Sequence, residues 1–380
     1  MTPVELSRTV LHAVRRAVEE GELSVAVPER VRVAPPGPGG CGDYATNVAL
    51  QLARPAGQPA LRVAEVLRAR LKGAGGISEV VVTGPGFINF RVAGTAPGEL
   101  VREILRRGER YGHGASLAGR GGGVVRLRAA RDVRAVVHGD VLARLLRSQG
   151  ASVHVSCVGP LEEGWRDVLE VRFDLPDSDD GRPGTDHRGN SHIDRHSHID
   201  VRPLPAPADP LPLGRDAARW ALLWPAPHDR PRIGEEHLVQ RESNPLFRVR
   251  YAHARCRGLL RNAADLGFGP EPGAVEPRGA QEPQETREMQ EPQETQVLLR
   301  ALADHPRVLA AAAAHHAPDR LARHLVAVAD AVLPLFPAVL PMGEEKPSAA
   351  HRARLALAVA AGTVLAGGLS LLGIDAPDHL

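Results

Sequence analysis

Aromatic residues and lysines are scarce in this sequence. Phe, Trp and Tyr together make up 3% of 380 residues, so Leu, Val and Ala must fill the cores. Only Lys72 and Lys346 are lysines, so nearly all the basic charge is arginine. The formal net charge is +2 at pH 7, a balance that permits an RNA partner without requiring one.

The sequence also has no cluster of cysteines and no segment typical of a targeting signal. Cys41, Cys157 and Cys256 form no C-x-x-C pair, which argues against a zinc site and a disulfide framework. Charges recur through residues 1–30, which is unlike a signal peptide, so we expect a cytosolic protein. The uncharged run from Leu355 to Ile374 has transmembrane length, but its glycines and alanines favour a buried helix of a bundle.

Motifs that usually carry catalysis are also lacking. There is no G-x-S-x-G motif, and no Lys-Ser or Lys-Thr pair follows the glycines at 121–123 as a P-loop requires. Residues 37–42 fit G-x-G-x-x-G, but no β-α-β run follows, so we predict a loop that enters a helix. Histidines at 187, 192, 196 and 198 do not form an H-E-x-x-H motif, and the polar segment around them looks disordered, so we predict no specific metal site.

The hydrophobic pattern predicts a multidomain protein that combines α/β and all-α parts. Residues 1–112 form a small α/β domain in this interpretation. Its expected elements are helices over 2–21, from Asp43 onward and over 61–71, and strands over 31–33, 77–82 and 87–92. A further helix over 97–109 leads out of it.

Residues 120–212 form the predicted middle domain, with strands over 124–127 and 153–158 around a helix over 136–149. From 174 to 212 periodicity vanishes, which predicts a disordered linker. The pattern over residues 213–380 predicts an antiparallel helix bundle, with breaks at Pro306, Pro318 and Pro334–Pro347. A polar, low-complexity insertion is expected over 269–295.

Two motifs near the start resemble the N-terminal additional domain of arginyl-tRNA synthetases, which contacts the tRNA elbow. They are Gly42-Asp43-Tyr44-Ala45-Thr46-Asn47 and Gly84-Pro85-Gly86-Phe87-Ile88-Asn89. The resemblance implies a set of tRNA-binding residues: Asp43, Tyr44, Thr46, Asn47, Phe87 and Asn89. The alternative is structural, with Asp43 capping a helix and Tyr44 packing in the core.

The stretch Asn244-Pro245-Leu246-Phe247-Arg248-Val249-Arg250-Tyr251-Ala252-His253-Ala254-Arg255 resembles the entry to the same family's DALR-type anticodon-binding domain. The resemblance implies tRNA contacts from Asn244, Arg250, Tyr251, His253, Arg255 and Arg257. Tyr251 would serve as a base platform and the arginines as phosphate contacts. A packed helix seam is the alternative for Tyr251 and His253.

The middle departs from the family. A helix resembling the one after the first ATP signature remains at Gly139–Leu146, but residues 126–134 contain no His-x-Gly-His box. The basic second signature before Gly214 is also missing, and adenylation needs such positive groups on the developing pyrophosphate. We therefore predict a catalytically inactive paralogue with a vestigial nucleotide-binding middle. It would have no catalytic residue and no cofactor, and would bind tRNA or a tRNA-like RNA. The alternatives are residual arginine-tRNA ligase activity and a protein-interaction module without RNA binding.

Overall fold

The computed structural model describes residues 3–34, 36, 44–92, 97–118, 123–173, 198–273 and 293–380. The chain divides into two compact units, Met1–Leu100 and Val101–Leu380. The division falls inside helix α4, Pro97–Arg107, which the sequence predicted as the exit from the first domain.

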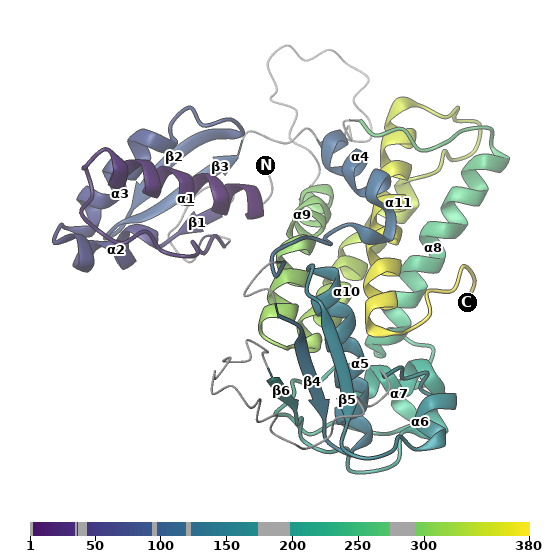
Figure 1. Ribbon diagram of the computed structural model, residues 1–380. Coiled ribbons are helices and arrows are strands. Elements are labelled where there is room, and N and C mark those ends of the chain that lie inside the picture. Colours follow the sequence, from purple (N-terminus) through teal and green to yellow (C-terminus); the bar gives the residue numbers. More distant parts are fainter. Residues whose placement is uncertain are drawn as a thin grey trace, which may run out of the picture. The chain divides into compact units, whose positions relative to one another are not determined.

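Unit 1 is a three-stranded antiparallel sheet covered by helices (Figure 1). Its elements are α1 (Pro3–Glu19), β1 (Tyr44–Thr46), α2 (Val48–Ala56), α3 (Ala60–Leu71), β2 (Ile77–Thr83) and β3 (Phe87–Val92). The strand order is β1-β3-β2. Apolar residues at helical spacing on α1, including Leu6, Val10 and Val14, are fully buried in the core of this unit.

The segment after the glycine-rich loop is a strand, so the helix predicted from Asp43 onward was wrong at its start. Tyr44 pairs with Phe90 and Thr46 with Ile88, and both Tyr44 and Thr46 point into the core. Pairing with the edge of β3 outweighs the helical spacing of Ala45 with its neighbours, and α2 begins only at Val48. Asp43 lies outside the described residues. The strand expected over 31–33 is absent there, and only an isolated bridge joins Ala34 to Ala45.

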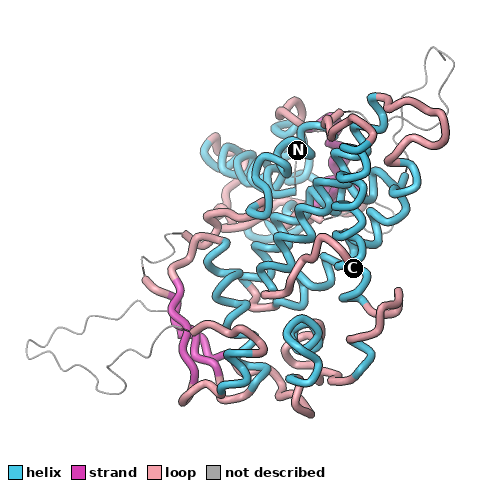
Figure 2. Tube along the Cα trace, turned by 90° about the vertical axis from the view of Figure 1, so that its right-hand side faces the viewer, coloured by secondary structure: helices cyan, strands magenta, loops and turns pink. Residues whose placement is uncertain are grey.

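Unit 2 contains a small parallel sheet with strand order β5-β4-β6 (Figure 2). Its first part consists of the end of α4, a 3-10 turn (Gly108–Arg110), β4 (Val125–Ala129), α5 (Val133–Ser148), β5 (Val153–Cys157), α6 (Glu163–Asp167) and β6 (His198–Val201). Helix α5 connects the parallel strands β4 and β5, as in a nucleotide-binding fold.

Strand β6 falls inside the segment predicted to be a loop or linker, which corrects that prediction for residues 198–201. Four residues rich in His and Asp show no strand pattern by themselves. They form β6 because Ile199 and Val201 pair with Leu127 and Ala129 of β4. Residues 174–197 and 274–292 lie outside the described residues. The end of the expected insertion is also corrected, because Thr295 is fully buried in α9.

The rest of unit 2 is an antiparallel helix bundle, as the sequence predicted. Its elements are a 3-10 turn (Leu211–Leu213), α7 (Gly214–Leu223), a second turn (Glu235–His237), α8 (Pro245–Asp265), α9 (Gln293–Ala314), α10 (Pro318–Val332), a third turn (Leu333–Ala338) and α11 (Ala349–Leu372). Helix α9 runs through Pro306, so the break predicted there was wrong. The apolar face from Leu298 to Leu309 stays buried across the proline.

Helix α11 is internal to the bundle. It is long and apolar enough to cross a membrane, as is Pro318–Ala338, but 72% of its most apolar window is buried inside the protein. Its glycines allow close packing: a Cβ at Gly362 would lie 2.9 Å from the Cβ of Cys256 on α8. This agrees with the bundle-helix interpretation of the uncharged run.

Three rings form a buried stack that links the start of unit 2 to the bundle. The centroids of Tyr111 and His305 lie 5.9 Å apart, and those of His305 and His324 lie 5.2 Å apart. Burial lowers the pKa of His324 to about 4 and that of His305 well below its ordinary value. Both rings are therefore neutral in the folded protein at pH 7.

Acid should destabilise unit 2 through these histidines. Between pH 6.5 and about 4, His324 is protonated in the unfolded chain but stays neutral in the fold. Its stabilising contribution is complete above pH 6.5 and is lost as the pH falls, by about 1.4 kcal/mol per unit. Melting temperatures from pH 7 to 5 should fall more steeply for wild type than for His324→Gln. The exposed His228→Gln is the control, and parallel curves for wild type and His324→Gln would contradict the assignment.

Candidate functional site

Most of the unit 1 residues predicted to bind tRNA are structural. The Tyr44 ring is 7% exposed and belongs to the core, so it cannot stack on a base. The Thr46 hydroxyl donates to the Arg32 carbonyl at 2.7 Å, and the Asn89 amide donates to Thr83 Oγ1 at the same distance. Both side chains are buried. The prediction is therefore corrected for these three residues, because inward-facing strand positions bury them.

Two predicted residues of unit 1 remain accessible. Phe87 is 41% exposed and follows Gly86, whose φ of +132° favours glycine and lets the turn approach Ala60 closely. Asn47 is half-buried, and its Oδ1 accepts only a local bond from Gln51 at 3.2 Å. An exposed ring and an amide are suited to contact a nucleic acid.

On helix α8, Asn244 and His253 also have structural roles. Asn244 caps the helix: its Oδ1 accepts from Leu246 N, while its amide donates to the carbonyls of His237 and Val239. His253 is 4% exposed, and its Nδ1 lies 3.1 Å from the Gly362 carbonyl on α11. The helix-seam interpretation is correct for His253, and the proposed RNA contacts of both residues are corrected.

Accessible rings and charge meet on one stripe of α8. Tyr251 is 39% exposed, and its ring stacks on that of Phe247 with centroids 5.7 Å apart. Arg255 follows one turn later and is exposed. We call Phe247, Tyr251 and Arg255 the α8 stripe, since they lie four residues apart on one face. Phe247 was missed from the sequence, although its spacing to Tyr251 could have identified it.

The other two predicted arginines of α8 are engaged inside the protein. An Arg250 guanidinium nitrogen lies 3.5 Å from Asp216, and Arg257 forms a two-pronged pair with Asp378 at 2.9 and 3.1 Å. Because Asp216 and Asp378 already neutralise these two arginines, their electrostatic attraction for a phosphate is weakened. Arg255 is thus the arginine of the predicted set with the freest side chain.

The N-terminus of α5 lies within residues 126–134, the segment that the family resemblance compares with the first ATP signature, and a side chain of the protein caps it. The Asp132 carboxylate caps the helix, accepting from Arg134 N at 3.0 Å and Ala135 N at 3.2 Å. A negative side chain therefore occupies the amides that would otherwise receive a phosphate. This capping pair was not identified from the sequence.

The buried side chain of Arg134, in the first turn of α5, binds carbonyls of neighbouring segments. Its buried guanidinium donates five hydrogen bonds to the carbonyls of Leu204, Leu222, Pro225, Ala226 and Asp229. All five N–H groups are used, so none is left for a ligand. His138, one turn further along α5, is fully buried with Nε2 3.1 Å from the Leu222 carbonyl, and burial lowers its pKa to about 3.

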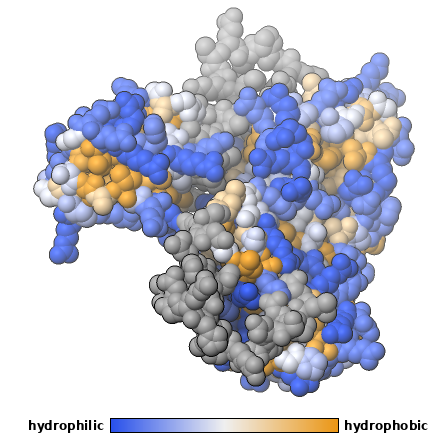
Figure 3. Space-filling view, in the orientation of Figure 1, coloured by the Kyte–Doolittle hydropathy of each residue, from blue (hydrophilic) through white to orange (hydrophobic). Residues whose placement is uncertain are grey.

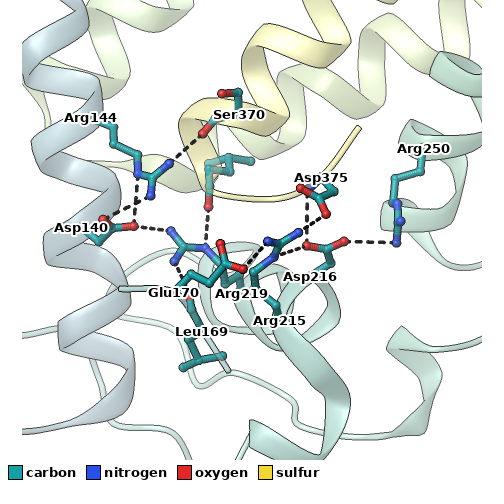
Figure 4. Close-up of polar contacts among 11 residues, drawn as sticks. Asp140, Arg144, Leu169, Glu170, Arg215, Asp216, Arg219, Arg250, Ser370 and Asp375 are labelled. Atoms are coloured by element: carbon teal, nitrogen blue, oxygen red, sulfur yellow. Dashed lines mark hydrogen bonds and ion pairs between the residues drawn. The ribbon is translucent and has the colours of Figure 1, made fainter. Parts of the chain in front are cut away.

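A buried ion pair joins α5 to α7 and to the end of α11 (Figure 4). Arg219 donates to Asp140 at 2.5 Å, to the Leu169 carbonyl at 2.8 Å and to the Leu372 carbonyl at 2.9 Å. Arg144 lies 3.2 Å from the same Asp140 carboxylate and donates to the Ser370 carbonyl. Neighbouring Arg215 pairs with Glu170, Asp216 and Asp375. The network fixes the sheet-bearing part of unit 2 to the bundle.

A cavity of about 640 Å³ lies beside this network. Arginines and carboxylates both line it, among them Arg215, Arg257, Glu170, Asp375 and Asp378. Because these groups pair with one another, the cavity offers a ligand little uncompensated charge. Within the described parts of the chain, no three His, Cys, Asp or Glu residues are placed to hold a metal ion.

Comparisons with known proteins match both ends of the chain to domains of one family. A model of the arginyl-tRNA synthetase N-terminal domain matches residues 5–92, and a model of the DALR anticodon-binding domain matches residues 249–380. The chain is 28% identical to an arginine–tRNA ligase of Frankia alni and 27% identical to one of Pseudarthrobacter chlorophenolicus, with 100% of both chains covered in each case.

Solved structures share the fold. The Thermus thermophilus arginyl-tRNA synthetase aligns with a TM-score of 0.64 at 17% identity over 100% of both chains. The Plasmodium falciparum arginyl-tRNA synthetase aligns with a TM-score of 0.65 at 9% identity, over 100% of this chain and 99% of that one. With an α/β unit of the N-terminal type and a DALR helix bundle in one chain, this protein belongs to the arginyl-tRNA synthetase family.

Removing Asp140 should test how strongly the network supports unit 2. Asp140→Ala leaves the Arg219 charge buried without its carboxylate, which typically costs about 3–5 kcal/mol. The control Asp330→Ala breaks the half-exposed pair with Arg248 and should cost about 1 kcal/mol or less. Chemical denaturation of both variants measures the difference, and similar losses in the two would show that Asp140 is not a special support.

Proposed function

We propose that this protein binds tRNA or a tRNA-like RNA and does not form arginyl-adenylate. The observation that carries the second half is the N-terminus of α5. There the Asp132 carboxylate and the fully bonded Arg134 stand where a synthetase would hold ATP phosphates. An acidic cap repels the pyrophosphate that adenylation develops, instead of stabilising it.

The length of the chain also supports inactivity. Its alignment with the Frankia alni ligase spans 567 positions, whereas the chain has 380 residues, so at least 187 positions have no residue here. The two terminal regions match their family models, and the middle retains the parallel strands β4, β5 and β6. A catalytic domain that is this reduced has little chain with which to enclose ATP, arginine and an acceptor end.

The relatives are named arginine–tRNA ligases, which favours residual ligase activity as the second candidate. That activity needs a group that binds the ATP phosphates. At the α5 end, Arg134 is not available for this task because it donates only to carbonyls, so the exposed Arg131 beside it is the cation that such activity would have to use.

The binding half of the proposal relies on accessible residues of both units. Phe87 and Asn47 lie within the N-terminal family match, while Tyr251 and Arg255 of the α8 stripe lie within the DALR match. Paired aromatic rings beside a cation can stack on a base and contact the adjoining phosphate. We expect this binding in the cytosol, as a component of translation or its regulation.

Arginine-dependent exchange of pyrophosphate into ATP should stay at the level of a blank without enzyme. The physical reason is the acidic Asp132 cap at the α5 terminus, together with an Arg134 side chain that is fully bonded inside the protein. An active synthetase assayed in parallel provides the positive control. Exchange clearly above the blank, abolished by denaturing the protein, would contradict the proposal and establish the ligase candidate.

Tyr251→Ala should weaken tRNA binding by roughly one to two decades, since a stacked base contributes on the order of 1–3 kcal/mol. Because the ring is 39% exposed, the melting temperature should change little. Tyr251→Phe keeps the ring and should retain most of the affinity. A filter-binding titration with bulk tRNA measures all three proteins, and a wild type that fails to bind at low salt would overturn the binding half.

A further inference from the structure

A depression of about 510 Å³ in unit 2 is lined by arginines from segments far apart in the sequence. Arg106 and Arg107 come from the last turn of α4, Arg110 from the following 3-10 turn, and Arg147 from the last turn of α5. His113, Gly114, Ser148 and Gly150 complete the lining, which contains no acidic residue. All four arginines are exposed.

The frame of this depression is fixed by backbone contacts. Gly114 N donates to the Ser148 carbonyl at 2.9 Å, and the Gln149 amide donates to the Gly112 carbonyl at 3.2 Å. Arg147 donates to the Val153 carbonyl at 2.8 Å. The segment after α4 is thereby attached to the end of α5, so the arginines are held near one another at little further entropic cost.

The arginines of this depression differ in how far acidic side chains neutralise them. Glu103 alone pairs with both Arg106 and Arg107, at distances from 2.6 to 2.9 Å. Arg110 has no acidic partner among the described residues. The 640 Å³ cavity differs, because carboxylates pair with its arginines.

Helix ends explain part of this arrangement. Arginines in the last turns of α4 and α5 offset the partial negative charge of the terminal carbonyls. That effect does not require four guanidinium groups around one hollow. The surface over α4 is hydrophilic (Figure 3), so an apolar partner is not suited to it.

We propose that this depression binds the phosphate backbone of a double-stranded RNA stem. Guanidinium groups pair with phosphate oxygens in a two-pronged geometry, and several together release counterions from a nucleic acid. The lining contains no Phe, Tyr or Trp, and its one ring is that of His113, so guanidinium groups dominate the surface offered to a ligand. The contact is therefore independent of sequence and positions the RNA. The inference rests on the proposed function, to which it adds a contact outside unit 1 and the α8 stripe.

The test compares Arg110→Glu/Arg147→Glu with wild type on two probes, bulk tRNA and a short blunt RNA duplex without loops. The control Arg230→Glu/Arg320→Glu reverses the same charge at exposed positions outside the depression. A second variant, Arg110→Lys/Arg147→Lys, keeps the charge. Equal melting temperatures exclude misfolding, and affinities are measured across a salt series.

Wild type should bind the duplex at low salt, and the glutamate variant should lose on the order of tenfold or more, with a log–log salt slope shallower by about two. The lysine variant and the control should stay close to wild type. Absence of duplex binding by wild type, or equal losses in the glutamate variant and the control, would overturn the proposal.

The two probes separate this inference from the proposed function. In one outcome, wild type binds the duplex, the glutamate variant does not, and wild type binds tRNA no more tightly than the duplex. This would refute the proposed function and support the depression as a backbone site. Tight tRNA binding that is unchanged in the glutamate variant, with no duplex binding, would refute the depression and leave the proposed function standing.

Discussion

The arrangement of unit 2 depends on one buried cation. Arg219 is fully buried on α7, and its guanidinium reaches Asp140 on α5 and the last carbonyl of α11. Gly373 is required beside it, because a Cβ there would overlap the guanidinium. A charge of this kind is expensive to bury, so every donor needs a partner. The parts that supply those partners must then stay together, which connects the parallel sheet to the anticodon-type bundle.

A second buried arginine holds the segments on both sides of α7 against α5. Arg134 donates to the carbonyl of Leu204 before this helix and to four carbonyls between residues 222 and 229 at and after its end. Under the proposed function, this helix end would stabilise the fold through internal hydrogen bonds and would not bind a phosphate. Inactivity and a stable fold would then be compatible.

Much of the fold was predictable from the sequence, and the failures have local causes. Regular apolar spacing located α1, α3, α5 and the strands β2 and β3. Strands β1 and β6 were missed because short polar segments become strands only through pairing with distant partners. Pro306 did not break α9, since burial of the helix face on both sides outweighed the loss of one donor.

The candidate site was less predictable, because a motif does not show which way its side chains point. Tyr44 and Tyr251 both came from motifs resembling RNA-binding segments, yet one ring is 7% exposed and the other 39%. The period of a strand buries Tyr44, whereas the period of α8 brings Tyr251 to the surface beside Phe247. Motif residues such as Thr46, Asn89, Asn244 and His253 maintain the fold, so persistence of the motifs is explained partly by stability. Under the proposed function, we expect RNA to be recognised by residues that do not stabilise the fold, namely the exposed rings and exposed arginines.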